Sequence, residues 1–238
     1  MPGPVRGSFY LPESRKHFRP QKDFHTKHIR IELSLDFQKK RASGSCTLTL
    51  EPLRSGLRAI RLDACNLDID EVTVDGKAED FEYDGKNLRL KLSDEVPKET
   101  RVKVGYSTVP IEGIFFTSPD EKNPQREVQA WSHNQADFAR YWYPCFDHPD
   151  DRSTTELVIT VPRGFRVISN GRLISNKDGD KTSTFHWLED IPHSTYLTSF
   201  VAGKFAEVTE EADGVSCITT SRSRRGTTWR GISGKPLG

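Results

Sequence analysis

The sequence predicts an all-β fold, an antiparallel β-saddle or sandwich, over about residues 26–212. Two observations support this prediction. Seven segments of the first half alternate apolar and polar residues with a period of two, which is typical of half-buried strands. Short turns that contain Gly and Asp join these segments, whereas the spacing of an amphipathic helix is not found.

The first half is expected to form a meander of short strands. The clearest covers 29–37, where apolar residues occupy every second position. A polar turn is expected at 38–44. Asp75-Gly76 and Asp84-Gly85 predict tight turns because both residue types tolerate positive φ. The other expected strands are Cys46–Leu50, Ile60–Leu62, Ile69–Val74, Phe81–Tyr83, Leu88–Leu92 and Val102–Tyr106.

The second half is expected to begin with a long connection at 107–126 and to continue with strands. Asn170-Gly171 and Asp178-Gly179 mark turns between them. Outside the β domain, we expect an arm rich in Pro, Arg and Lys at 1–25 and a basic tail at 213–238. The expected strands are Leu157–Val161, Phe165–Ile168, Thr182–Trp187 and Tyr196–Phe205.

Composition predicts a soluble globular protein. The chain has 238 residues, of which 34% are hydrophobic and 29% charged. No run approaches the roughly 20 apolar residues that span a bilayer, and the N-terminus has no apolar leader, so neither a membrane nor a secretory signal is expected. The Cys residues at 46, 65, 145 and 217 are far apart, which predicts buried free thiols and a cytoplasmic protein.

The charge distribution argues against a nucleic-acid partner. The net charge is +1, but residues 217–238 hold five basic residues and no acidic one. The rest of the chain therefore carries 30 basic and 34 acidic residues. A body with this balance is not expected to bind a polyanion.

Sequence motifs for catalysis and metal binding are missing. None of the seven His residues lies in His-Glu-x-x-His, whereas a catalytic zinc needs three convergent protein ligands. His25 and His28 are three positions apart in an expected strand, so we expect their side chains on opposite faces. Nucleophile elbows and phosphate-binding loops are missing too. We therefore predict neither a metal site nor a catalytic residue in this chain.

The segment 129–149 is the most unusual part of the sequence, because it combines a Tyr-Trp-Tyr run with Arg140 and several acidic residues. We expect Arg140 to pair with a buried carboxylate such as Asp147. Asp147, Asp150 and Asp151 are expected to form a turn rather than an acid–base pair. Stacking of nucleic-acid bases on the aromatics is a weaker interpretation, because the main body is acidic.

Four segments in a fixed order resemble the aminopeptidase N and leukotriene hydrolase family of zinc metallopeptidases, over about residues 25–207. The Tyr-Trp-Tyr-Pro144 run is similar to bacterial-type members of that family. The four segments are His28–Phe37 followed by Gly44, Ala139-Arg140 with Pro144-Cys145-Phe146-Asp147 and Pro149, Ile168-Ser-Asn-Gly171, and Ser194–Gly203.

The resemblance implies a role beside an active site. In that family the matching region is an N-terminal β-saddle that docks on the catalytic domain and forms one wall of the substrate cleft. The position that helps to hold the free amine of a peptide substrate corresponds to Gln135. His133, which stands where the family usually has Gln, is the second candidate substrate-binding residue. His148 stands where an acid is usual. The remaining matched positions imply a structural motif, formed by Arg140, Pro144, Cys145, Asp147 and Pro149.

The resemblance also implies what this chain lacks. The family's Gly-x-Met-Glu-Asn loop is missing, since the only Met is Met1, and so is the zinc helix. Zinc therefore belongs to the full-length family and no cofactor is expected in this chain. The expected partners are a missing catalytic domain and a peptide substrate, with no nucleic acid and no membrane. No hydrolysis is expected from the chain alone.

The basic tail departs from the family pattern. After Ser216 the sequence loses alternation and consists mostly of Ser, Arg, Gly and Thr. One interpretation is a frameshift near residue 217 that truncates a longer aminopeptidase-like protein. The other is a disordered basic tail of a genuine short protein.

Two other functions stay open at this point. The first is a non-catalytic protein-interaction scaffold, because a domain of this kind can bind partners without zinc ligands. The second is a carbohydrate-binding β-sandwich, which rests on the aromatic residues alone and predicts that Trp142→Ala abolishes glycan binding.

Overall fold

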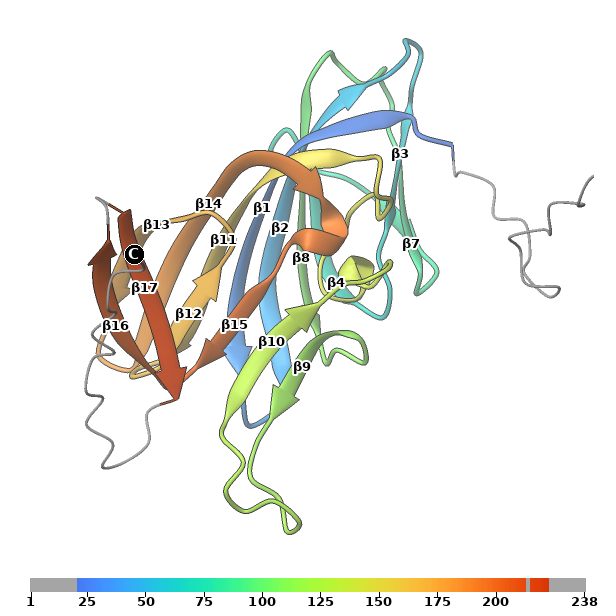
Figure 1. Ribbon diagram of the computed structural model, residues 1–238. Helices are drawn as coiled ribbons and strands as arrows, with labels where there is room; N and C mark the ends of the chain where they lie inside the picture. The colour runs from blue at the N-terminus through green and yellow to red at the C-terminus, as the bar shows by residue number, and fades with distance from the viewer. Residues whose placement is uncertain (1–20, 213–214, 223–238) are drawn as a thin grey trace, which may run out of the picture.

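The protein is almost entirely β in the computed structural model, which describes residues 21–212 and 215–222 and side chains up to Phe205. An eight-stranded sheet forms the centre, and a four-stranded sheet, a three-stranded sheet and a two-stranded hairpin complete the structure. The four-stranded sheet crosses one face of the large curved sheet (Figure 1). The predicted all-β saddle is thereby confirmed, and no α-helix occurs in the described residues.

The strands are assigned to the sheets as follows. The large sheet has the order β13 (Arg172–Asp178), β14 (Thr182–Ser194), β11 (Arg152–Pro162), β1 (Phe24–Asp36), β2 (Arg41–Pro52), β8 (Thr100–Thr108), β4 (Asp68–Val74) and β5 (Lys77–Ala78). The four-stranded sheet has the order β12 (Arg166–Ser169), β15 (Phe200–Gly203), β10 (Gln129–His133) and β9 (Gly113–Thr117). The three-stranded sheet is β3 (Ala59–Asp63), β7 (Asn87–Lys91) and β6 (Phe81–Tyr83), and the hairpin is β16 (Phe205–Ala212) with β17 (Val215–Arg222). Two short 3-10 helices follow β10 and β14, namely η1 (Ala139–Tyr141) and η2 (Thr195–Leu197).

The core lies between the large sheet and the smaller ones. Every second residue of β1 from Ile29 to Leu35 is buried, as the alternation in the sequence predicts. The Phe37 ring then contacts Phe116 of β9, with centroids 5.8 Å apart, and Phe165 before β12, at 4.6 Å. Burial of each such side chain stabilises the fold by about 1.5–3 kcal/mol. These rings therefore fasten the four-stranded sheet onto the large one.

One pair of neighbouring strands in the large sheet is parallel. β1 runs parallel to β11, with Ile29 opposite Thr155, whereas its other neighbour β2 is antiparallel. The buried carboxylate of Asp151 fixes the start of this pair, because it accepts the Thr26 backbone N–H at 3.1 Å and binds Lys22 Nζ at 2.9 Å. The sheet is therefore mixed, although the sequence predicts only antiparallel pairing.

The expected tight turns are present. Asp75 and Gly76 have φ values of 50° and 81° and join β4 to β5. Gly85 has a φ of 82° and joins β6 to β7. Backbone conformations of this kind favour Gly and Asp, which is why the sequence located both turns.

Several expected boundaries are wrong. The turn after β1 is shorter than 38–44, because β2 already begins at Arg41. The connection at 107–126 contains β9, and strands β10 and β13 were not expected. The strand expected at 196–205 is divided into η2, β15 and the start of β16. β9 and β13 escape detection because neither alternates buried and exposed residues regularly.

The expectation for the two histidines of β1 is also wrong. The register of β1 against β2 shifts between Thr26 and His28, which marks a β-bulge. Phe24 and Thr26 are buried before the bulge, and Ile29 is buried after it. An extra residue reverses the parity of the strand, so His25 and His28 lie on the same face.

Part of the expected tail is a strand. β17 pairs with β16 from Arg222 opposite Phe205 to Val215 opposite Ala212, so the hairpin crosses the expected boundary at 213. The arm is also shorter than 1–25, since β1 begins at Phe24. Residues 1–20 of the arm, and residues 213–214 and 223–238 of the tail, lie outside the described residues. The division into three domains stays a prediction. No helix in the part of the chain that the structure describes is long and apolar enough to cross a membrane.

Gly113 lets β9 approach η1 closely. Its φ is 79°, and a Cβ atom here would lie 2.5 Å from the Phe138 carbonyl oxygen and 2.7 Å from Cδ1 of Trp142. Real Cβ atoms do not come this near to backbone. Both its conformation and its surroundings therefore demand glycine at this position.

We predict that Gly113→Ala lowers the free energy of unfolding by about 2 kcal/mol more than Gly164→Ala does. Gly164 is a matched control, because its φ is 86° but a Cβ there would meet nothing within 4 Å. Gly164→Ala should lower the free energy of unfolding by only about 1 kcal/mol, because alanine is strained at a positive φ. Urea denaturation measures both, and equal losses would contradict the close approach of β9 to η1.

Candidate functional site

The loop between β10 and η1 is held in place by the buried side chain of Asn134. The Asn134 Nδ2 donates to the carbonyl oxygens of Thr198 and, at 3.4 Å, of Thr195. The Asn134 Oδ1 accepts the indole N–H of Trp142 at 2.8 Å. One side chain thus joins the loop to η2 and to the core, and it fixes the conformation of its neighbours.

The two residues on either side of Asn134 point away from the protein. His133 and Gln135 are both exposed, and neither side chain has a bonding partner among the described residues. The peptide bond between Gln135 and Ala136 is cis. The structure therefore places both predicted substrate-binding residues on one loop, with an imidazole and a carboxamide free to contact a ligand.

Arg140 and Asp147 form the ion pair that the sequence predicts. Asp147 Oδ2 accepts the Arg140 backbone N–H at 3.2 Å and its Nε–H at 3.1 Å. Asp147 Oδ1 accepts the Thr195 hydroxyl at 2.7 Å. Arg140 belongs to η1 and Thr195 to η2, so the buried carboxylate of Asp147 links the two short helices.

Burial governs the electrostatics of this pair. It raises the pKa of the Asp147 carboxyl, and the bonds from Thr195 and Arg140 only partly oppose that shift. Burial alone would lower the pKa of the Arg140 guanidinium. The nearby carboxylates of Asp63 and Asp147 have the larger combined effect, so the pKa of Arg140 is raised. The charges of Arg140 and Asp147 thus stabilise the loop between η1 and β11.

The backbone of the same loop attaches it to its surroundings. Cys145 exchanges two backbone hydrogen bonds with Asp63 of β3, at 2.7 and 3.0 Å. The carbonyl oxygen of Pro144 accepts the Cys46 thiol at 3.7 Å, and that of Pro149 accepts the Ser194 hydroxyl at 2.7 Å. Every residue of the expected structural motif thus has a contact that holds the loop.

The aromatic residues of the segment are mostly part of the core. Trp142 and Tyr143 are fully buried, and the Tyr106 hydroxyl donates to the Trp142 carbonyl oxygen at 2.6 Å. A fully buried indole cannot stack on a sugar ring or a base. Burial therefore removes Trp142 and Tyr143 from the carbohydrate-binding and base-stacking interpretations, which stay predictions for the partly exposed Tyr141.

The described residues offer no metal site and no activated nucleophile. No group of three or more His, Cys, Asp or Glu residues in that part of the chain could hold a metal ion. Cys46, Cys65 and Cys145 are buried free thiols, as predicted, and burial raises the pKa of each. The Asp151 carboxylate binds the Thr26 backbone N–H and Lys22 Nζ at the start of β1, in keeping with a structural role.

Sequence reasoning missed three residues on which the site depends. They are Asn134, which bonds from the loop to η2, and Asp63 and Thr195, which bond to Asp147 from distant parts of the chain. No local pattern identifies such partners. The one usable signal is the position of Asn134 next to a strand end, where an Asn side chain commonly bonds to backbone.

Comparison with known proteins decides the family. The sequence profile of the Peptidase M1 N-terminal domain matches residues 25–197, which is most of the chain. The chain belongs to the peptidase M1 family through this N-terminal domain. The match ends at η2 and includes the Asn134 loop, the Arg140–Asp147 pair and both candidate substrate contacts.

Curated relatives of this M1 domain are longer proteins. It is 30% identical over 202 residues to the "Probable aminopeptidase 1" of Sulfurisphaera tokodaii, covering 83% of this chain and 24% of the relative. It is 29% identical over 191 residues to the "Leucine aminopeptidase 2" of Candida glabrata, covering 76% of this chain and 28% of that one. The chain thus spans about a quarter of the length of the curated relatives it matches.

Solved structures share the fold of the M1 domain. The M1 zinc metallopeptidase of Deinococcus radiodurans aligns with a TM-score of 0.73 at 19% identity, over 88% of this chain and 50% of that one. Leukotriene A4 hydrolase of Saccharomyces cerevisiae aligns with a TM-score of 0.67 at 24% identity, over 78% and 30%. At these identities the likeness concerns the fold.

We predict that Asp147→Ala lowers the free energy of unfolding by about 3 kcal/mol, because it leaves a half-buried guanidinium and a buried hydroxyl without their partner. Glu99→Gln is the matched control. It breaks the exposed pair with Lys27 at 3.0 Å and should have little measurable effect. Thermal and urea unfolding measure both. A variant Asp147→Ala as stable as the control would contradict the structural role of the pair.

Proposed function

We propose that this M1 N-terminal domain forms the substrate side of a zinc aminopeptidase-like protein and contacts the free N-terminus of a peptide. The observation that carries the proposal is the Asn134 loop, where buried bonds fix one residue and leave its two neighbours free. The relatives named above are aminopeptidases, which supports the same substrate class.

The chemistry of the loop suits a peptide amine. The Gln135 carboxamide oxygen accepts hydrogen bonds, and an ammonium group donates up to three. Such a bond is weaker than one to a carboxylate, so Gln135 would orient a substrate rather than hold it alone. Because Asn134 keeps the loop rigid, little conformational entropy is lost when a ligand binds.

In this proposal hydrolysis belongs to another domain. The described residues do not fit a zinc ion, since they offer no convergent set of ligands. Zinc and the reacting groups are therefore assigned to a catalytic domain, the proposed partner of this one. We further propose a cytoplasmic location, supported by the three free buried thiols.

A second candidate function is a non-catalytic interaction scaffold. Large apolar side chains are exposed near η2, with Ile191 69% and Leu197 48% accessible, and such surface is typical of protein contacts. Size-exclusion chromatography separates the two functions. A monodisperse, monomeric chain would favour a self-sufficient scaffold, whereas concentration-dependent aggregation would favour a domain that needs its partner.

We predict that the purified chain does not hydrolyse aminoacyl chromogenic substrates, with or without added zinc, because the described residues contain no site for the ion. Release of the chromophore is followed by its absorbance. Turnover that a chelator abolishes would contradict the division of roles between two domains.

We predict that a peptide with a free amine, such as trialanine amide, shifts the backbone NMR signals of residues 133–135, and that the N-acetylated peptide does not. Gln135→Ala should weaken the interaction about tenfold, because it removes a hydrogen bond to a charged group. Gln38→Ala, at an exposed turn after β1, is the matched control and should change nothing. Equal shifts with the acetylated peptide would refute recognition of the amine.

A further inference from the structure

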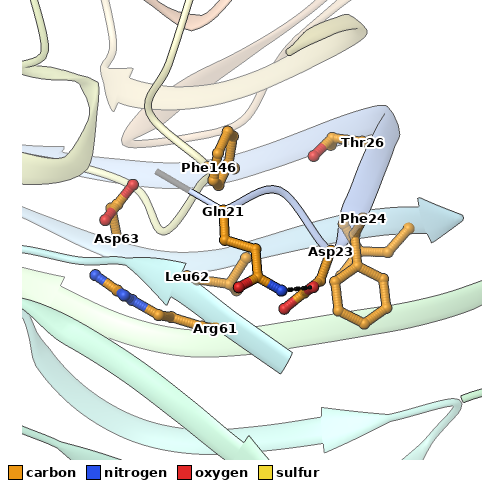
Figure 2. A pocket seen from close by; sticks show the side chains of 9 residues that line it. Gln21, Asp23, Phe24, Thr26, Arg61, Leu62, Asp63 and Phe146 are labelled. Carbon is orange, nitrogen blue, oxygen red and sulfur yellow. Dashed lines mark hydrogen bonds between the residues drawn. The ribbon is translucent and has the colours of Figure 1, made fainter. Parts of the chain in front are cut away.

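A cavity separate from the Asn134 loop lies where the start of β1 meets β3. Its volume is about 170 Å³, and the loop that carries Phe146 closes one side (Figure 2). Gln21, Phe24 and Thr26 come from the segment that enters β1, and Arg61 and Asp63 come from β3. Neither His133 nor Gln135 contributes to it. The cavity therefore needs an explanation of its own.

Thr26 brings an unused polar group into this cavity. The residue is 2% exposed, and its backbone N–H donates to Asp151 at 3.1 Å. Its hydroxyl, however, has no partner among the described residues. Figure 2 shows the hydroxyl turned toward Phe146 and Gln21. Because a buried hydroxyl without a hydrogen bond is unfavourable, this group favours a polar ligand atom beside it.

Arg61 and Asp63 supply opposite charges on the same face of β3. Asp63 Oδ2 accepts the Asp147 backbone N–H at 3.0 Å, which leaves Oδ1 without a described partner. Arg61 donates from Nε and Nη2 to the Asn87 carboxamide oxygen at 3.2 and 2.8 Å, which leaves Nη1 available. Since the two are only two positions apart in a strand, they can reach neighbouring groups of one small ligand.

The rest of the lining is apolar. Phe24, Leu62 and Phe146 surround the polar groups and provide a surface for a hydrophobic side chain. Figure 2 places Phe146 and Phe24 on different sides of Gln21, so that apolar contact is available from two directions. A few polar groups within an apolar lining are typical of small-molecule sites.

We propose that this cavity binds a free α-amino acid with an apolar side chain, such as leucine. The ammonium group binds Asp63 Oδ1 and the Thr26 hydroxyl, the carboxylate binds Arg61 Nη1, and the side chain packs on Phe146. A simple anion would meet the carboxylates of Asp63 and Asp23, and a simple cation would meet Arg61. A zwitterion alone matches both signs of charge.

The test is calorimetric titration of the full chain with L-leucine, N-acetyl-leucine and leucine methyl ester. We expect leucine to bind in the millimolar range, which is ordinary for so small a ligand. Each blocked compound lacks one of the two charges and should bind at least about tenfold more weakly. An ester that binds as well as leucine would overturn the assignment of Arg61, and so would failure of leucine to bind at all.

Variants assign the contacts to residues. Thr26→Val keeps the shape of the side chain and should weaken leucine binding about fivefold, and Arg61→Gln about tenfold. Arg61 is exposed, so its variant should fold even if Thr26→Val does not. Arg101→Gln removes an exposed charge from β8 and is the control. Unchanged affinity in Arg61→Gln would refute the proposal.

The outcome is distinguishable from a failure of the proposed function. Leucine should shift the NMR signals of Thr26, Asp63 and Phe146 and leave those of the Asn134 loop unchanged. Shifts confined to residues 133–135 would instead assign the amino acid to the peptide-binding loop and would overturn a separate site.

Discussion

The buried carboxylate of Asp147 is the interaction on which the candidate site depends. Its two oxygens bond Arg140 of η1 and Thr195 of η2, so that two segments far apart in the sequence are fixed relative to each other. Asn134 then bonds the carbonyl oxygens of Thr195 and Thr198. The loop is thus positioned through a continuous network of buried bonds, and its exposed residues are free to serve recognition.

The same network reaches the cavity beside β3. Asp63 accepts the backbone N–H of Asp147 and exchanges two backbone bonds with Cys145. It also lines the cavity. The three-stranded sheet, the start of β1 and the loop that carries Cys145 and Asp147 therefore meet at Asp63. Asp147 therefore serves this framework, whereas Asp151 fixes the start of β1.

Much of the fold could be predicted from the sequence because β1 after its bulge, β2 from Cys46 to Leu50 and β8 from Thr100 to Val104 bury every second residue. The turns at Asp75 and Gly85 were equally clear, since their backbone conformations restrict residue choice. The parallel partner of β1 and the bulge near Lys27 could not be predicted, because both depend on contacts between distant segments.

The candidate site was predictable only in part. The Arg140–Asp147 pair followed from a charge beside aromatics, and the roles of His133 and Gln135 stay predictions that rest on resemblance. The hydrogen bond between Trp142 and Asn134 was not predicted, because an Asn beside a strand end signals a bond to nearby backbone rather than to a particular ring. Contacts of this kind depend on how the chain folds, so they can be identified only once the three-dimensional structure is known.

The parallel pairing of β1 with β11 has a consequence for the order of synthesis. Arg30 and Glu156 sit side by side although 126 residues separate them in the chain. At 5–20 residues per second, one edge of β1 stays open for roughly 6–25 s before a ribosome delivers β11. An open strand edge invites wrong pairing with other chains, and charged side chains discourage it. Arg30 and Glu32, which alternate with the buried residues of β1, place such charges on this strand for the interval before the sheet can close.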